Sequence, residues 1–178
     1  MQSELFGITG AAGEVGGRVF RRLEPLGVRQ RLIVREGTDL IAPNRCEVEP
    51  ITDYGDAESF ESAVRGVTTL FLVSGREHED RLRQHFTAVN AAVAAGVERI
   101  VYLSFLGAAP GATFTLARQH YATEEHIRSK GVAFTFLRSS LYLDFIPWFC
   151  SADGVIAGPA GDGRFAPVAH AMTSQTPW

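Results

Sequence analysis

A cluster of closely spaced glycines near the start of the chain narrows the possible folds more than any other part of the sequence. From Gly7 to Gly17 the chain reads Gly-Ile-Thr-Gly-Ala-Ala-Gly-Glu-Val-Gly-Gly. A short apolar strand pattern over 5–9 precedes this cluster, and apolar residues at helical spacing follow over 13–23. Glycines between a strand and a helix allow a tight turn, and they let backbone N–H groups approach a phosphate. The sequence therefore predicts a phosphate-binding loop.

Beyond this loop, apolar strand patterns alternate with helical patterns. The strand patterns are continuous apolar runs, which are typical of a parallel sheet covered on both faces. They lie at residues 5–9, 31–35, 46–48, 68–73, 100–103 and 132–137. The helical patterns lie at 13–23, 56–64, 80–95 and 116–130, and 36–44 is expected to be a loop or a very short helix. This order predicts an α/β fold of Rossmann type, with a doubly wound parallel sheet and helices on both faces.

The composition argues against several classes of protein. The net charge of −3 disfavours general nucleic-acid binding, which usually needs a basic face. The longest apolar runs, such as 70–73, are far shorter than the ~20 residues of a membrane span. The first residues lack the pattern of a signal peptide, so a cytoplasmic location is expected. The five histidines and two cysteines have no metal-ligand or redox spacing, so we expect no metal and reduced thiols.

The spacing Gly10-x-x-Gly13-x-x-Gly16 resembles that of NmrA-like and extended short-chain dehydrogenases. Further matching segments lie at 72–74, 94–104, 131–138 and 161–164, so the resemblance extends to about residue 169. The chain is most similar to the NAD(P)H quinone oxidoreductase-like subgroup of the NmrA-like atypical short-chain dehydrogenases.

The resemblance implies a cofactor-binding domain over 1–140 and the start of a substrate lobe over 141–178. It also implies an oxidoreductase that uses NAD(P)H to reduce a small carbonyl or quinone substrate. A non-catalytic regulatory protein that senses NAD(P) and an inactive fragment are the alternatives. The expected cofactor contacts in the glycine loop come from Gly7, Thr9, Gly10, Ala11, Ala12, Gly13, Glu14, Val15 and Gly16. Glu14 would repel a pyrophosphate unless its carboxylate points to solvent.

The residue that ends the second strand normally faces the adenosine ribose and distinguishes the two cofactors. An acidic residue there would accept a hydrogen bond from the 2′-OH of NAD, whereas an Arg would pair with the 2′-phosphate of NADP. Arg35 takes this position, so NADP(H) is favoured, although Glu36 could serve the acidic role and leaves NAD(H) open. By the resemblance, the residues near the adenine are Asp53 and Tyr54, and those near the ribose or diphosphate are Ser74 and Gly75. Ordinary turn chemistry is the alternative for these four.

The usual proton relay of short-chain dehydrogenases, a Tyr followed four residues later by a Lys, is absent. Tyr121 is followed at that distance by Glu125, and the only lysine is Lys130. In NmrA-like relatives a Lys or His near the start of this helix approaches the nicotinamide, and His120 matches it. Ser104 matches a polar position beside the nicotinamide. His120 could donate a proton to a quinone oxygen or only hydrogen-bond the ribose. A surface role for His120 and a turn role for Ser104 are the alternatives.

After His170 the sequence departs from the family pattern. Relatives would continue with a segment like Asp-Asp-Val-Ala-Asp, whereas this chain reads Ala-Met-Thr-Ser-Gln-Thr-Pro-Trp. With GC-rich codons, reading from the third base of the Ala codon gives Asp/His-Asp-Val-Ala-Asp-Ala-Val, which predicts a frameshift near residue 170. The resemblance thus implies a C-terminally truncated chain in which most of the substrate lobe is missing.

Apolar surface left exposed by such a truncation favours association, and a homo-oligomer is one option. The aromatic residues at 142–149 could line a site for a flat substrate or pack in a core. A turn-rich hairpin is expected at 154–166, which contains four of the glycines.

Overall fold

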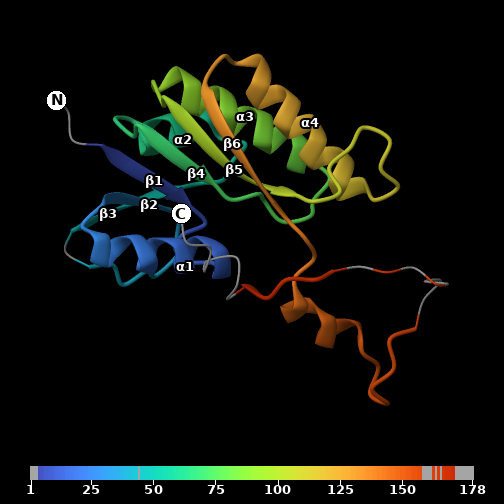
Figure 1. Ribbon diagram of the computed structural model, residues 1–178. Coiled ribbons are helices and arrows are strands. Elements are labelled where there is room, and N and C mark those ends of the chain that lie inside the picture. Colours follow the sequence, from blue (N-terminus) through green and yellow to red (C-terminus); the bar gives the residue numbers. More distant parts are fainter. Residues whose placement is uncertain (1–3, 44, 158–161, 163, 165, 171–178) are drawn as a thin grey trace.

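The computed structural model describes residues 4–43, 45–157, 162, 164 and 166–170, and it contains a six-stranded sheet (Figure 1). Neighbouring strands are parallel, and their order across the sheet is β3-β2-β1-β4-β5-β6. The strands are β1 (Leu5–Thr9), β2 (Arg29–Arg35), β3 (Cys46–Ile51), β4 (Thr69–Leu72), β5 (Arg99–Phe105) and β6 (Ala133–Ser139). This is the strand order of the doubly wound dinucleotide-binding fold, and it confirms the predicted fold class.

Helices cover both faces of the sheet, as predicted. They are α1 (Glu14–Leu23), α2 (Ala57–Val64), α3 (Arg81–Ala94) and α4 (Thr115–Ser129), with 3-10 helices η1 (Glu24–Leu26) and η2 (Leu143–Phe149). Helix α1 lies on one face, and α2, α3 and α4 lie on the other (Figure 1). In the described ranges, no helix is both long and apolar enough to span a lipid bilayer.

Each face of the sheet has its own apolar core. Ile8 and Phe71 from the sheet pack with Phe20 of α1 in one core, whereas Leu70 packs with Phe60 of α2 in the other. Successive side chains of a strand point to opposite faces. Leu70 and Phe71, adjacent in β4, therefore serve different cores, and this explains why the strand pattern is continuously apolar.

The main differences from the predicted boundaries occur around β2 and β3. Strand β2 begins at Arg29 rather than at residue 31, and β3 continues to Ile51 rather than ending at residue 48. Pro50 is tolerated within β3 because β3 is an edge strand. In the described part of 36–44 there is no helix, and the N–H of Thr38 donates to the carbonyl of Arg35 in a turn, so the loop alternative is confirmed.

The segment that follows β6 runs away from the sheet (Figure 1). The side chains of Trp148 and Phe149 in η2 are 81% and 64% exposed, so they form no core within the described part of the chain. The hairpin predicted over 154–166 lies largely outside the described residues, and those of its residues that are described form no strand.

Candidate cofactor site

The glycine cluster lies where the strand order of the sheet changes direction. Strand β1 pairs with β2 on one side and with β4 on the other. In doubly wound sheets the connections that leave two such strands run to opposite faces, which opens a ligand crevice at the carboxyl ends of the strands. The loops after β1 and β4 are therefore where a cofactor site is expected from topology alone.

Two glycines are required by the geometry of the loop after β1. Gly10 has a φ of +60°, in the left-handed region that side chains of L-residues rarely adopt. Gly16 is buried in α1, and a Cβ there would lie 2.4 Å from the carbonyl oxygen of Gly10. Together they let α1 approach the end of β1 more closely than side chains would permit.

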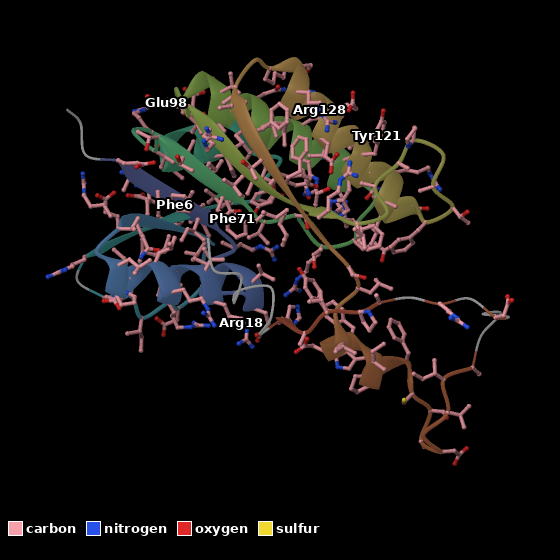
Figure 2. The ribbon with its side chains drawn as sticks, in the orientation of Figure 1. Phe6, Arg18, Phe71, Glu98, Tyr121 and Arg128 are labelled. Carbon is pink, nitrogen blue, oxygen red and sulfur yellow. The ribbon has the colours of Figure 1, made fainter. Side chains whose placement is uncertain are left out.

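The N-terminal end of α1 presents backbone donors. Gly13 is the N-cap residue, and no side chain caps the helix there. The first N–H groups of a helix have no acceptor within the helix, so this end can bind a phosphate. Glu14 is exposed and pairs at 3.0 Å with Arg18, one turn further along α1. The Arg18 side chain is labelled in Figure 2. The Glu14 carboxylate thus lies at the surface in an ion pair.

The remaining predicted loop residues divide into buried and exposed positions. Gly7 and Ala11 are buried, Val15 is half-buried against the α1-side core, and Ala12 is exposed beside Gly13. A Cβ at Gly7 would lie 2.9 Å from the side chain of Val67, so Gly7 serves packing within the sheet. The outer surface of the loop is therefore formed by Gly10 and by the segment that starts at Ala12.

Thr9 connects the ends of the two central strands. Its hydroxyl donates to the carbonyl of Phe71 at 3.3 Å and accepts from the N–H of Val73 at 2.8 Å. Because the hydroxyl is buried and used within the protein, Thr9 fixes the spacing of β1 and β4 below the crevice.

At the end of β2, Arg35 and Glu36 are both exposed. The N–H of Glu36 donates to the carbonyl of Ile51 at 2.9 Å, which continues the pairing with β3. Among the described residues, neither side chain forms an ion pair. The guanidinium of Arg35 is thus accessible to an anion, with a carboxylate next to it in sequence.

Asp53 and Tyr54 both have partners within the protein. The Tyr54 hydroxyl donates to the carbonyl of Val73 at 2.9 Å, and burial raises its pKa to about 12. The exposed Asp53 carboxylate accepts from the N–H of Gly55 and, at 3.5 Å, from Nε2 of Gln84. These contacts hold the loop after β3 against the end of β4, and contact with an adenine stays a prediction.

The loop after β4 contains Ser74 and Gly75, which are half-buried. Both backbone polar groups of Gly75 are hydrogen-bonded to side chains of α3. Its N–H donates to Nε2 of His85 at 2.9 Å, and its carbonyl accepts from Nε of Arg81 at 2.8 Å. Two residues of α3 that the sequence analysis did not assign to the site therefore hold this loop.

His120 is buried, so it is not a surface residue of α4. Its Nε2 lies 3.0 Å from Nη2 of Arg81, and its Nδ1 lies 2.9 Å from the hydroxyl of Tyr102. Burial and the nearby guanidinium lower the pKa of His120 to about 3, so the ring is neutral near pH 7. The role of proton donor stays a prediction, and this arrangement favours the alternative in which a neutral ring forms hydrogen bonds.

Ser104 is buried near the end of β5, where its hydroxyl donates to Oε1 of Glu124 at 2.6 Å. Glu124, on α4, is also buried and pairs with Arg138 of β6. Both predicted catalytic residues thus belong to hydrogen-bond networks that the sequence analysis did not predict. The available signal was the four-residue spacing of Arg81 and His85, and of His120 and Glu124, which places each pair on one helix face.

Within the described residues, no three or more His, Cys, Asp or Glu side chains are grouped so as to hold a metal ion.

The strand order and the glycine-lined helix N-terminus define a dinucleotide-binding protein of the doubly wound class. The chain belongs to the NAD(P)H-binding family, whose model matches residues 10–145. The predicted resemblance to NmrA-like proteins and quinone oxidoreductases is confirmed by similarity to individual proteins.

The chain is 32% identical over 181 residues to quinone oxidoreductase 2 of Escherichia coli, covering 94% of this chain and 60% of that protein. The crystal structure of that oxidoreductase with NADPH superposes with a TM-score of 0.78 at 33% identity, covering 95% of this chain and 62% of that one. The Citrobacter sp. triphenylmethane reductase in complex with NADP(H) gives a TM-score of 0.76 at 29% identity, covering 96% and 62%.

An NmrA-like family domain-containing oxidoreductase of Aspergillus flavus is 30% identical over 103 residues, covering 54% of this chain and 34% of that protein. This chain therefore spans about three fifths of the length of the quinone oxidoreductase and the triphenylmethane reductase.

Proposed function

We propose that this chain is the cofactor-binding part of an NADPH-dependent reductase that acts on a quinone or another small carbonyl substrate. The observation that carries the proposal is the uncapped N-terminus of α1, with exposed Gly13 beside Gly10 in the left-handed conformation. A family match over residues 10–145 and similarity to a quinone oxidoreductase support the same function.

NADPH is favoured over NADH because of the position of Arg35. Its exposed guanidinium at the end of β2 suits the 2′-phosphate of NADP, with which an arginine forms bidentate hydrogen bonds. Two similar proteins have been solved with NADPH or NADP(H), which agrees with this choice. Asp53 and Tyr54 would then border the adenine side, and Ser74 and Gly75 the ribose or diphosphate.

Ser104 and His120 are proposed to border the nicotinamide, which would supply a hydride to the substrate. Ser104 lies near the carboxyl end of β5, at the same edge of the sheet as the glycine loop, and His120 of α4 lies 2.9 Å from the Tyr102 hydroxyl of the same strand. The neutral His120 ring and the Ser104–Glu124 hydrogen bond would fix the shape of this end of the site. We also propose that the cofactor domain extends to about residue 140, because the chain leaves the sheet after β6.

The test is a titration of the purified chain with NADPH and with NADH, followed by cofactor fluorescence. The matched variants are Gly13→Asp, which places a carboxylate at the phosphate site, and Gly111→Asp, in an exposed loop where a Cβ meets nothing within 4 Å. We expect saturable binding that is tighter for NADPH, is lost in Gly13→Asp and is kept in Gly111→Asp. Absence of binding by the folded wild-type chain would overturn the proposed cofactor.

Oxidation of NADPH in the presence of a quinone then tests the reaction. Turnover by this chain would support the reductase. Binding without turnover by a longer chain that includes the rest of the relatives' length would instead favour a regulatory protein that senses NAD(P).

A further inference from the structure

Arg81, at the start of α3, is a buried cation whose hydrogen-bond partners are all neutral. Its side chain is among the largest that are fully enclosed, with 2% of the residue exposed. The guanidinium donates to the carbonyl of Gly75 at 2.8 Å, to Oε1 of Gln119 at 3.0 Å and to Nε2 of His120 at 3.0 Å. Among the described residues no carboxylate forms an ion pair with it. Burial of a charge without an ion-pair partner is unfavourable, and these hydrogen bonds offset part of that cost.

The proton positions around Arg81 follow from groups that can only donate. Because a guanidinium has no acceptor, Nε2 of His120 must be unprotonated, and its proton lies on Nδ1, toward Tyr102. The N–H of Gly75 donates to Nε2 of His85, so the His85 proton also lies on Nδ1, 3.1 Å from Oγ1 of Thr123. Both rings are thus neutral Nδ1–H tautomers.

These contacts form a closed ring of five residues drawn from four parts of the fold. The carbonyl of Gly75 binds Arg81, and the ring returns to the N–H of Gly75 through His85. Its members are Gly75 in the loop after β4, Arg81 and His85 of α3, Tyr102 of β5 and His120 of α4. The longest link, 3.4 Å between the Tyr102 hydroxyl and Nδ1 of His85, is a shared donation from the Nδ1–H that Thr123 also accepts. Movement of the Gly75 loop or of the His120 ring therefore requires the Arg81 contacts to change.

We propose that Arg81 is a positioning residue of the cofactor site, which holds the Gly75 loop and the His120 ring in one arrangement and fixes His120 as its neutral Nδ1–H tautomer. The proposal rests on the proposed function, in which Gly75 lies beside the ribose or diphosphate and His120 beside the nicotinamide. One guanidinium then links the two ends of the cofactor site through its planar fork of donors, which a lysine cannot reproduce.

The charge around His120 agrees with this role. Arg81 and His85 of α3 and Tyr102 of β5 lie around the ring, and Glu124, one turn further along α4, is already paired with Arg138. A proton added to His120 would place a second buried cation 3.0 Å from Arg81, and the Glu77 carboxylate, which attracts Arg81, forms no ion pair with it among the described residues. His120 therefore accepts a hydrogen bond at Nε2.

The experiment compares the wild-type chain with Arg81→Lys, Arg81→Met and the control Arg83→Met. Arg83 lies on the same helix, but it is exposed and pairs with Asp80 at the surface. Nitrogen NMR of 15N-histidine-labelled protein reports the tautomer and titration of each ring, and a His120→Gln variant assigns the signal. Fluorescence titration of the same samples gives the Kd for NADPH.

We expect the wild type and Arg83→Met to show His120 as a neutral Nδ1–H ring. In Arg81→Met we expect protonation at Nε2 and titration nearer the ordinary histidine value, whereas Arg81→Lys, which keeps a positive charge and has no acceptor, should keep the Nδ1–H form. The Kd for NADPH should rise roughly tenfold, the effect of losing a charge-assisted hydrogen bond that holds a binding loop. Because Arg81→Lys keeps the charge, a rise in that variant assigns the effect to the fork geometry, and it keeps the test valid if Arg81→Met does not fold.

An unchanged His120 tautomer in Arg81→Met would overturn the proposal, and so would an unchanged Kd for NADPH in both Arg81 variants. Failure of the wild-type chain to bind NADPH would overturn the proposed function. In that case the NMR measurement would still decide whether Arg81 sets the state of His120.

Discussion

Glu124 and Arg138 form a two-point ion pair that connects α4 to β6. Nε of Arg138 lies 2.9 Å from Oε1, and Nη2 lies 2.6 Å from Oε2. The carboxylate is fully buried, whereas the guanidinium side chain is 39% exposed. A buried carboxylate needs a partner, so this pair determines how the end of β6 lies against α4, next to Ser104.

Replacement of Arg138 by Met should lower the free energy of unfolding by about 2 kcal/mol. The substitution leaves the Glu124 carboxylate with the Ser104 hydroxyl and with Arg128, whose nitrogen is 3.8 Å away. Loss of one partner of a fully buried pair costs about 3–5 kcal/mol, and the partial exposure of Arg138 reduces this value. Urea unfolding at pH 7 measures the change.

The control for this prediction is Arg83→Met, which removes an exposed ion pair with Asp80. Its effect should stay within about 0.5 kcal/mol, as for most surface pairs. Equal effects of the two substitutions would show that the Glu124–Arg138 pair behaves like a surface pair.

A methyl group at Gly16 should destabilise the protein strongly. The new Cβ would lie 2.4 Å from the carbonyl oxygen of Gly10, and a backbone atom cannot move aside as a flexible side chain can. We expect Gly16→Ala to lower the free energy of unfolding by at least about 2 kcal/mol, toward the upper part of the range for overpacking. Thermal unfolding followed by circular dichroism measures it.

Gly111→Ala is the matched control, because a Cβ there meets nothing within 4 Å and Gly111 does not have a positive φ. Its midpoint temperature should equal that of the wild type. If Gly16→Ala were equally harmless, the close approach of α1 to β1 would not be needed for folding.

The fold was predictable from sequence because its determinants are local. Continuous apolar runs identify buried parallel strands, and the glycines after β1 identify the turn into α1. The boundaries of β3 were less predictable, since the tolerance for Pro50 depends on the edge position of this strand, which only the complete sheet defines.

The position of Arg35 at the end of β2 was predictable because it follows directly on a continuous apolar run, whereas its contact with the cofactor stays a prediction. The partners of His120 were not predictable, because Arg81 and Tyr102 come from other elements and meet it only through packing of α3, α4 and β5. A charged residue such as Arg81 at a helix start is usually solvated, so its burial gave no local signal.

Removal of the Arg35 guanidinium should reduce the preference for NADPH. In Arg35→Ala the Kd for NADPH should rise about tenfold or more, since a charge-assisted pair with the 2′-phosphate is lost. The Kd for NADH should change little, because NADH lacks that phosphate. Fluorescence titrations with both cofactors measure the ratio.

Arg22→Ala, at an exposed position in the last turn of α1, is the control for a general loss of positive charge. It should leave both Kd values unchanged. A parallel rise for NADPH and NADH in Arg35→Ala would argue that Arg35 supports the loop rather than the 2′-phosphate.

The two buried histidines should make the folded state sensitive to mild acid. Burial and the cation of Arg81 lower the pKa of His120 to about 3 and that of His85 well below 6.5, whereas an unfolded histidine titrates near 6.5. Between these values the unfolded state binds more protons than the folded state, so stability decreases as the pH falls below about 6.5. The His120 ring should cost about 2 kcal/mol between pH 7 and pH 5, and the His85 ring adds to this loss.

Urea unfolding at pH 7, 6 and 5 measures this loss in the wild type and in His120→Gln, whose amide oxygen can still accept from Arg81. His120→Gln should remove the part of the loss that comes from His120, and His78→Gln, at an exposed position, is the control for replacing a histidine outside the buried pair. An equal pH dependence in all three proteins would mean that His120 gains a proton in the folded state near its ordinary pKa. The closed ring through Arg81 forbids this, because both nitrogens of His120 would then be donors and one would face the guanidinium.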